Sequence, residues 1–227
     1  MNSSRCRMQR SKWMCKVRIP GSFVLSALIA FVFVTGCAEK GPVLLNIAYQ
    51  APAEKAVTAS KIVVGVSPFR DGRGEPASVL GKRTIPSGMQ SDLVVQGTVA
   101  ETATISLKEA LTRRGIAVRD VAGWDLTAEG IQAEGAALVL GGEIKVFWLE
   151  STASASAFNT HLMASVQLKI AAGDTAEKKV IRTIDVSSKL DQDVLYSHEL
   201  LENMLSEALS SAIDQIFNDA ELKKRFQ

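Results

Sequence analysis

Apolar and polar residues alternate most regularly in the second half of the chain. From Leu162 to Ile170 every second residue is apolar, and mostly polar residues lie between them. Residues 177–190 continue this period of two after a turn at Gly173-Asp174. A period of two is typical of a strand with one buried face. With the apolar segment 137–152 before them, these segments predict three long antiparallel strands that form a meander.

Two other segments repeat apolar residues at helical spacing. Residues 98–114 place one apolar stripe on a helix, and Thr98 with Glu101 makes the capping-box pair at its start. Gly115 follows this segment as a stop signal. Residues 197–219 show the same spacing over a longer stretch, whereas we expect the last residues, 221–227, to fray.

The stretch before the meander is less regular. Residues 61–69 are typical of a short buried strand, and residues 70–88 have the glycine and proline content of a long loop. A second strand at 116–120 would complete one strand–helix–strand crossover. The predicted fold class is therefore α+β: a mixed sheet with a three-strand antiparallel meander, packed against two main helices.

The N-terminal residues have the pattern of a targeting segment. Six basic residues and no acidic one precede a short apolar run, residues 23–34. This run is too short for a spanning helix, which needs about 20 apolar residues. Val34, Thr35, Gly36 and Cys37 resemble the bacterial lipobox, in which the cysteine is acylated and becomes the first residue of the mature protein.

This resemblance predicts three parts of the chain: a lipoprotein signal peptide at 1–36, a lipidated N-terminus and tether at 37–60, and a single α+β domain at 61–227. An ordinary signal peptide with a chance cysteine, or an uncleaved anchor, is the alternative interpretation. Apolar residues near 43–49 suggest an edge strand or a loop within the tether. The start codon is left open, because Met8 or Met14 could begin a shorter signal peptide.

Cleavage before Cys37 changes the charge and the cysteine chemistry. The full chain has 26 basic and 24 acidic residues, and the six basic residues lost with the signal leave 20 against 24. A weakly acidic domain without a basic block argues against a nucleic-acid partner. Cys6 and Cys15 are lost with the signal, so the mature chain has one cysteine and forms no intramolecular disulfide.

Few residues are suited to catalysis. His161 and His198 are the only histidines, and their positions favour a surface role over that of a base or ligand. No metal-ligand spacing is present, and we expect no cofactor and no enzymatic activity. Arg70, Asp71 and Arg73 form a candidate interaction loop, which could bind an anion through its backbone but is more typical of a solvated turn.

Glycines and aromatic residues add weaker signals. Gly141-Gly142 indicates a β-bulge or a close backbone approach. Trp124 lies in a predicted loop and is a candidate for partner contact. Three other aromatic residues could line an apolar pocket, although an ordinary core is the commoner meaning of such a cluster: Phe147, Trp148 and Phe158.

Several motifs together resemble the YajG family of bacterial lipoproteins, which is similar to the auxiliary lipoproteins of ABC transport systems. They are the lipobox, "VGVSPFRDGRG", "ISLKEALTRRGIAV", "LVLGGEIKVFW", the meander and the long C-terminal helix. The resemblance implies an α+β sandwich, a periplasmic location and no catalysis, and it assigns no role to Asp71-Gly72-Arg73. By resemblance to lipoprotein sorting signals, Ala38 after the cysteine favours the outer membrane over the inner membrane.

These observations lead to three functional hypotheses. The first is a non-catalytic lipoprotein, anchored through acylated Cys37 at the periplasmic face of the outer membrane, that acts as an interaction or assembly accessory for an envelope protein. The alternative is a lipid-binding auxiliary subunit of an ABC-type transport system. An envelope enzyme built around Asp71, Arg73 and His161 is the third and least supported.

Overall fold

The computed structural model describes residues 41–51, 62–132, 135–154 and 159–226. These residues belong to one compact unit, Gly41–Gln227. The lipobox, Cys37 and Phe158 lie outside the described residues. The compact unit begins within the predicted tether, so residues 43–50 contribute to the fold.

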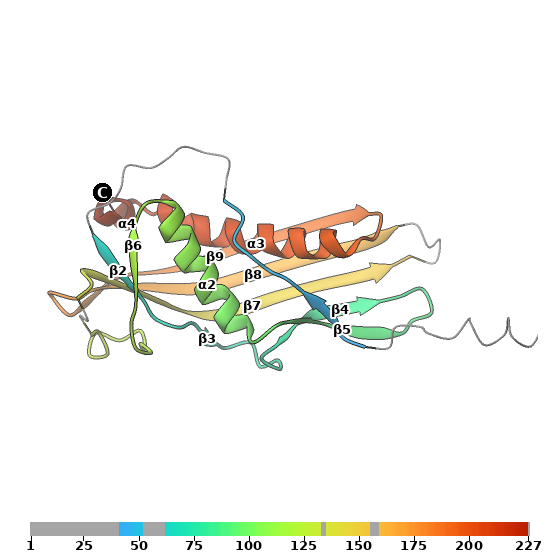
Figure 1. Cartoon of the computed structure of the whole chain (residues 1–227), viewed down its shortest axis with the longest axis horizontal. Helices are drawn as coiled ribbons and strands as arrows, with labels where there is room; N and C mark the ends of the chain where they lie inside the picture. The colour runs from blue at the N-terminus through green and yellow to red at the C-terminus, as the bar shows by residue number, and fades with distance from the viewer. Residues whose placement is uncertain (1–40, 52–61, 133–134, 155–158, 227) are drawn as a thin grey trace, which may run out of the picture. The chain divides into compact units, whose positions relative to one another are not determined.

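Three long strands form one side of the sheet (Figure 1). They are β7 (Leu138–Ala153), β8 (Thr160–Asp174) and β9 (Lys179–Val194), and each pairs antiparallel with the next. The alternation in the sequence sets this arrangement, because Leu162, Val166 and Ile170 of β8 all point into the core. The pairing of β7 with β8 shifts by one residue between Ile144 and Val146.

The opposite edge of β7 is covered by three short strands in succession. They are β2 (Val63–Val66), β3 (Arg70–Asp71) and β4 (Val79–Thr84), all parallel to β7. Beyond them lie β6 (Ala117–Asp120) beside β2, β5 (Gln90–Val95) beside β4, and β1 (Val43–Leu45) beside β5. The predicted crossover is confirmed, because β2 and β6 are parallel neighbours.

The predicted fold class is wrong in the size of the sheet. The described residues contain a nine-stranded mixed sheet and three helices, instead of a sheet organised around a three-strand meander with two main helices. Residues 70–88, predicted as a loop, contain β3 and β4, and β4 forms a hairpin with β5. The glycines and prolines that suggested a loop lie at the turns between short strands, which are too short to show a clear period.

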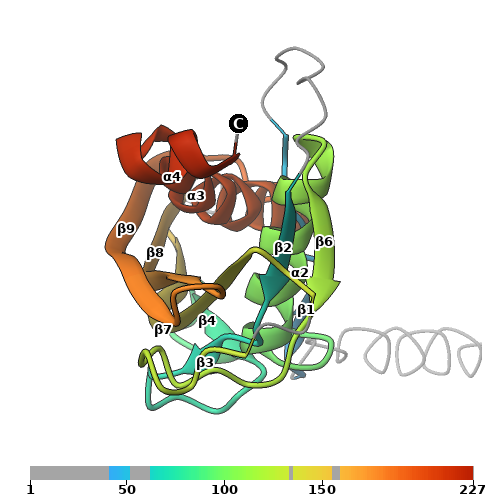
Figure 2. The same ribbon diagram turned by 90° about the vertical axis from the view of Figure 1, so that its left-hand side faces the viewer.

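The sheet curves around α2 (Val99–Arg113) and α3 (His198–Asn218), as Figure 2 shows. The capping box of α2 is confirmed: Thr98 accepts from the backbone of Glu101, and the Glu101 side chain accepts from that of Thr98. A third helix, α4 (Ala220–Phe226), corrects the expectation of a fraying end. Leu222 and Phe226 are buried, and they hold α4 against the core.

Residues 46–50 form an extended strap along α3. The backbone N–H groups of Asn46, Ala48 and Gln50 donate to the side chains of Glu202, Ser206 and Ser210, at 2.7, 3.2 and 2.7 Å. Two residues of extended chain rise by about 6.6 Å and four residues of helix by about 6.0 Å, so every second strap residue meets every fourth helix residue. Because strand side chains alternate, Ile47 and Tyr49 face the core.

Candidate functional site

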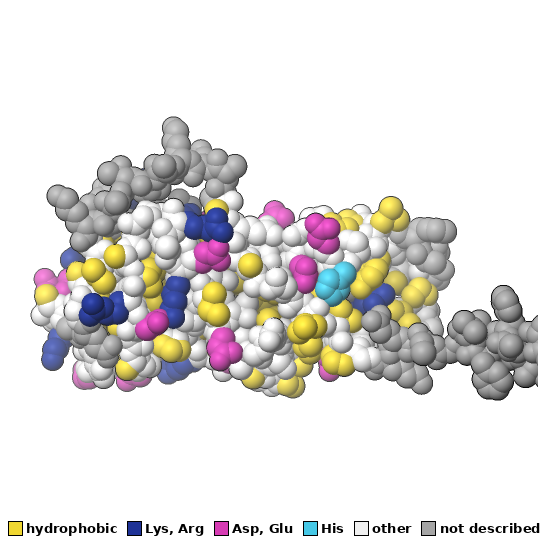
Figure 3. Space-filling view, viewed as in Figure 1, with side chains coloured by type: hydrophobic (Ala, Val, Ile, Leu, Met, Phe, Trp, Pro, Cys, Tyr) yellow, Lys and Arg dark blue, Asp and Glu magenta, His cyan; other side chains and the backbone are white. Residues whose placement is uncertain are grey.

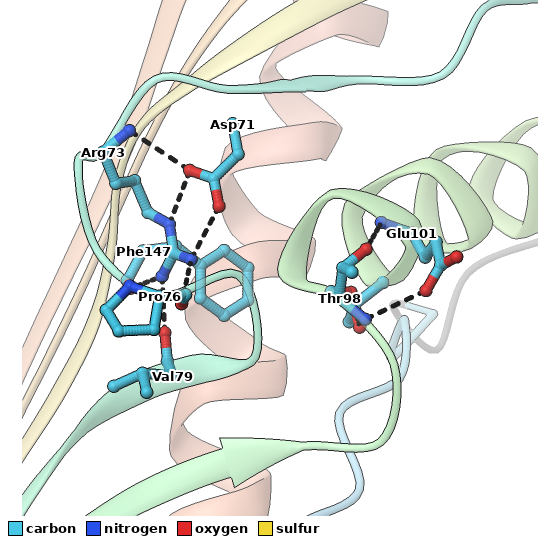
Figure 4. Close-up of polar contacts among 8 residues, drawn as sticks. Asp71, Arg73, Pro76, Val79, Thr98, Glu101 and Phe147 are labelled. Atoms are coloured by element: carbon cyan, nitrogen blue, oxygen red, sulfur yellow. Dashed lines mark hydrogen bonds and ion pairs between the residues drawn. The ribbon is translucent and has the colours of Figure 1, made fainter.

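Arg73 is a buried cation with every donor engaged (Figure 4). Its side chain is only 3% exposed. The guanidinium donates from Nε and Nη2 to the two carboxylate oxygens of Asp71, at 2.9 and 2.8 Å. Its remaining N–H groups donate to three backbone carbonyls: Val79 at 2.7 Å, Phe147 at 3.2 Å and Pro76 at 3.5 Å. All five guanidinium donors are therefore used within the protein.

This Arg73 cluster, Asp71 with Arg73 and the three carbonyls, fixes the approach to α2. The loop after Pro76 donates from Val79 back to the Pro76 carbonyl, and the carbonyl of Ala77 accepts from Val99, the first residue of α2. Phe69, just before β3, donates to the hydroxyl of Thr104 on the same helix, at 3.0 Å. The cluster thus links β4, β7 and the start of α2.

The three residues of the predicted interaction loop have different environments. Arg70 is exposed, whereas Asp71 and Arg73 bind each other and the backbone. The hydrogen bond from Arg73 lowers the pKa of Asp71 against the opposing effect of burial. An added Cβ at Gly72 would lie 2.5 Å from a Glu143 carboxylate oxygen and 3.1 Å from the Ile144 carbonyl oxygen, so the Glu143 side chain would have to move to admit it. An interaction role for this loop stays a prediction, and of its three charged side chains only that of Arg70 is not bound within the Arg73 cluster.

The two histidines lie at the surface. His161 approaches Asp193 at 3.1 Å and Asp191 at 3.5 Å across the β8–β9 pair, and its side chain is 49% exposed. His198, at the start of α3, lies 3.4 Å from Glu202. No group of three or more potential metal ligands occurs within the part of the chain that the structure describes.

Trp124 is buried rather than exposed, which corrects its assignment as a contact residue. Its ring packs in a small core with Val121 and Ile131, and its indole N–H donates to the carbonyl of Thr127 at 2.7 Å. Phe147 is also a core residue. The close approach at the glycine pair is confirmed, because a Cβ at Gly142 would lie 2.4 Å from the ring of Phe69.

The side of α2 that faces solvent carries one exposed large hydrophobic residue, Ile105. Ile105 is 61% exposed and lies between two grooves. The first, of about 410 Å³, runs between α2 and the strap, and Leu44, itself 55% exposed, lines it with Ile47 and Ser106. We call Leu44, Ile105 and the linings of these two grooves the α2 surface.

The second groove of the α2 surface lies on the other side of Ile105. It has a volume of about 230 Å³ and is mainly apolar, with Pro68, Phe69 and Ala100 in its wall. Figure 3 views the side of the domain that bears α2, where hydrophobic side chains are interspersed with charged ones, and further hydrophobic side chains lie to the right, over the β4–β5 end. This surface offers shape and apolar contact rather than reactive groups.

The strap wall of the first groove is held by a half-buried polar triad. The hydroxyl of Tyr49 donates to Asp214 at 2.7 Å and accepts from Arg114 at 2.6 Å, while Arg114 also donates to Asp214 at 2.8 Å. Burial, together with the hydrogen bond to Asp214, raises the pKa of Tyr49 to about 12. The hydroxyl therefore stays protonated and connects the strap to both helices at neutral pH.

A family comparison places residues 93–227 within a lipoprotein family described as "Uncharacterized lipoprotein". The chain belongs to this family. The lipoprotein has no match among the curated proteins. Within the described residues, no helix combines the length and apolar character needed to cross a membrane.

Several solved structures resemble this chain, all at low sequence identity and low TM-score. A Xanthomonas campestris protein is 9% identical, with a TM-score of 0.48 over 80% of this chain and 98% of its own. A putative neuraminyllactose-binding hemagglutinin homolog from Helicobacter pylori is 12% identical, with a TM-score of 0.44 over 80% and 96%. The lipoprotein GNA1162 from Neisseria meningitidis is 13% identical, with a TM-score of 0.38 over 70% and 99%.

Proposed function

We propose that this lipoprotein is a non-catalytic interaction or assembly accessory, anchored through acylated Cys37 at the periplasmic face of the outer membrane. The α2 surface is its binding site for an envelope protein. The observation that carries the proposal is the exposure of Ile105 between two grooves, on a helix fixed at its N-terminal end by the Arg73 cluster and near its C-terminal end by the Tyr49 triad.

A rigid frame around an open apolar surface favours binding. Exposed apolar side chains lose water contact when a partner covers them, and a helix that is already held in place loses little entropy on binding. Membership of the lipoprotein family and the lipobox sequence support the anchor. Ala38, in the position where Asp tends to retain a lipoprotein in the inner membrane, supports the outer membrane.

The anchor is tested by comparing the wild type with Cys37→Ser. We expect intact-mass analysis of the wild type to show a mature N-terminus at Cys37 with added acyl chains, and cell fractionation to place it with the outer membrane. The Cys37→Ser variant should lack the acyl mass and should no longer fractionate with the outer membrane. Identical mass additions and identical fractionation of the two proteins would refute the anchor.

The binding site is tested by a photo-crosslinking residue introduced at Leu44, in the wall of the first groove. We expect a discrete crosslinked envelope protein that disappears when Ile105→Glu is added. A crosslinker at Lys189, an exposed position on β9, is the matched control and should not capture the same protein. Capture that is unchanged by Ile105→Glu would exclude the α2 surface as the contact.

The lipid-binding alternative has less support from the fold. That hypothesis predicts either an apolar cavity between the sheet and the helix or an open groove. The facing residues of α3 and β8 belong instead to one packed core, which includes Leu201, Leu205, Leu209, Leu168 and Ile170. The open-groove form of the hypothesis is left with the two grooves beside α2, and mass spectrometry of the purified domain would detect a lipid bound there.

A further inference from the structure

Five large hydrophobic side chains are strongly exposed among the described residues, and they form two groups. Leu44 and Ile105 belong to the α2 surface. The other three are Met89, Leu195 and Tyr196, with exposed fractions of 44%, 66% and 38%. None of these three lines either groove beside α2. They therefore need a separate explanation.

The strand register places these three residues at one end of the sheet. A single row of paired residues crosses five strands there: Gln90, Thr84, Thr152, His161 and Asp193. Met89 directly precedes the first member of this row, and Leu195 follows the last member by two residues. Figure 1 shows the β4–β5 hairpin and the β9–α3 connection at the same end of the domain.

Tyr196 joins the two sides of this end. The guanidinium of Arg83, on β4, lies over its ring at 4.0 Å from the centroid. The connection that leaves β9 thus reaches the hairpin of β4 and β5. An aromatic ring stacked with a cation is a combination that suits the boundary between apolar chains and polar headgroups. We call Met89, Leu195, Tyr196 and Arg83 the apolar end.

The chain also enters the domain from this side. β1 is parallel to β5, with Val43 opposite Leu93, and β5 begins at the hairpin turn next to Met89. Gly41 and Pro42, the described residues before Val43, therefore lie toward the apolar end. Cys37 lies only four residues before Gly41, and four residues span at most about 14 Å when fully extended. Acyl chains on Cys37 would hold this end of the domain close to the bilayer.

We propose that the apolar end rests on the lipid surface, with Met89, Leu195 and Tyr196 in the headgroup region of the leaflet that holds the acyl chains. This inference depends on the proposed acylation of Cys37. The contact is shallow, because Asp191 and Asp193 lie at the same end and pair with His161, and these charged groups stay hydrated. The contact orients the domain and leaves the α2 surface open to the periplasm.

Orientation, rather than membrane affinity, is the quantity that reports this contact. Two or three acyl chains already anchor a protein firmly, since each buried CH₂ contributes about 0.8 kcal/mol. Removing three half-exposed side chains would not release such a protein. A probe attached at the apolar end should instead sense lipid, and a probe at the far end should not.

The test uses the full-length acylated protein in vesicles of phosphatidylethanolamine and phosphatidylglycerol that contain a nitroxide-labelled lipid. Leu195→Cys and Met89→Cys are labelled with an environment-sensitive fluorophore; the label reacts with the new thiol because Cys37 carries lipid. Glu177→Cys is the control, in the turn between β8 and β9 at the opposite end of these strands. We expect several-fold stronger quenching at 89 and 195 than at 177.

Two outcomes separate this inference from the proposed function. Intact-mass analysis of the same samples reports whether Cys37 is acylated. Protein that is acylated but shows equal quenching at all three positions would overturn the orientation and leave the anchor standing. Protein that is not acylated would overturn the anchor itself. As a further check, Met89→Glu should weaken quenching at 195, because a carboxylate opposes contact with lipid.

Discussion

The Arg73 cluster and the α2 surface are opposite exceptions to the rule that charged side chains are exposed and apolar side chains are buried. The charged side chain of Arg73 is 3% exposed, whereas the apolar residue Ile105 is 61% exposed. The buried charge has a partner for every donor, whereas the exposed isoleucine lies beside two open grooves. A fully partnered buried group is explained by the fold alone, whereas exposed apolar residues that line grooves together, as Ile105 and Leu44 do, indicate a contact surface.

The first prediction tests whether Arg73 is structural. Arg73→Ala should lower the free energy of unfolding by about 3 to 5 kcal/mol, because it leaves Asp71 and three carbonyls without their donor. Arg73→Lys should recover only part of this loss, since an ammonium group cannot form the bidentate pair. Urea unfolding followed by circular dichroism measures both variants.

Arg70→Ala is the matched control for the first prediction. Arg70 belongs to the same loop but is exposed, so its removal should change the free energy of unfolding by no more than about 0.5 kcal/mol. Equal losses for Arg70→Ala and Arg73→Ala would show that the cluster has no special structural role.

The second prediction concerns the strap that forms one wall of the α2 surface. Tyr49→Phe removes the hydroxyl but keeps the ring and the direct pair between Arg114 and Asp214. We expect a loss of about 1 to 3 kcal/mol in the free energy of unfolding, because the hydroxyl makes two hydrogen bonds, each with a charged partner. Tyr196→Phe, at an exposed tyrosine, should have almost no effect in the same urea titration. A larger loss at 196 than at 49 would contradict this assignment.

The third prediction uses pH to examine the Asp71–Arg73 pair. The pKa of Asp71 is lowered in the folded protein, so the pair stabilises the fold above the ordinary pKa of Asp, about 4. This stabilisation is lost as the pH falls through the lowered pKa. Wild type and Asp71→Asn should therefore differ most in urea midpoint near neutral pH, begin to converge below about pH 4 and converge fully only below the lowered pKa. A difference that stays constant from pH 7 to pH 3 would argue against the pair.

Sequence patterns could predict the long elements because each repeats its period many times. β8 shows the alternation over most of its length, and α2 has both a stripe and a capping box. The strand β4 has only six residues with Gly81 inside it, and it therefore resembled a loop. That glycine is required where β4 meets β7, since a Cβ would overlap the carbonyl oxygen of Leu149.

Only part of the candidate site could be predicted from the sequence. The partners of Arg73 include the carbonyl of Phe147, 74 positions away, and no local pattern indicates such a contact. Ile105 did carry a signal, because it lies off the apolar stripe that includes Val99, Ala103 and Leu107. An apolar residue on the polar side of a predicted helix is a useful indicator of a contact surface.

The last prediction has the smallest effect on stability and bears most directly on function. Ile105→Ala should change the free energy of unfolding by no more than about 0.5 kcal/mol, whereas Leu107→Ala, two residues along α2, should lower it by about 2 to 5 kcal/mol. If Ile105 serves a partner, Ile105→Ala should weaken crosslinking from Leu44 in a protein of normal stability. A large loss of stability in Ile105→Ala would instead make it a core residue and remove the basis for the α2 surface.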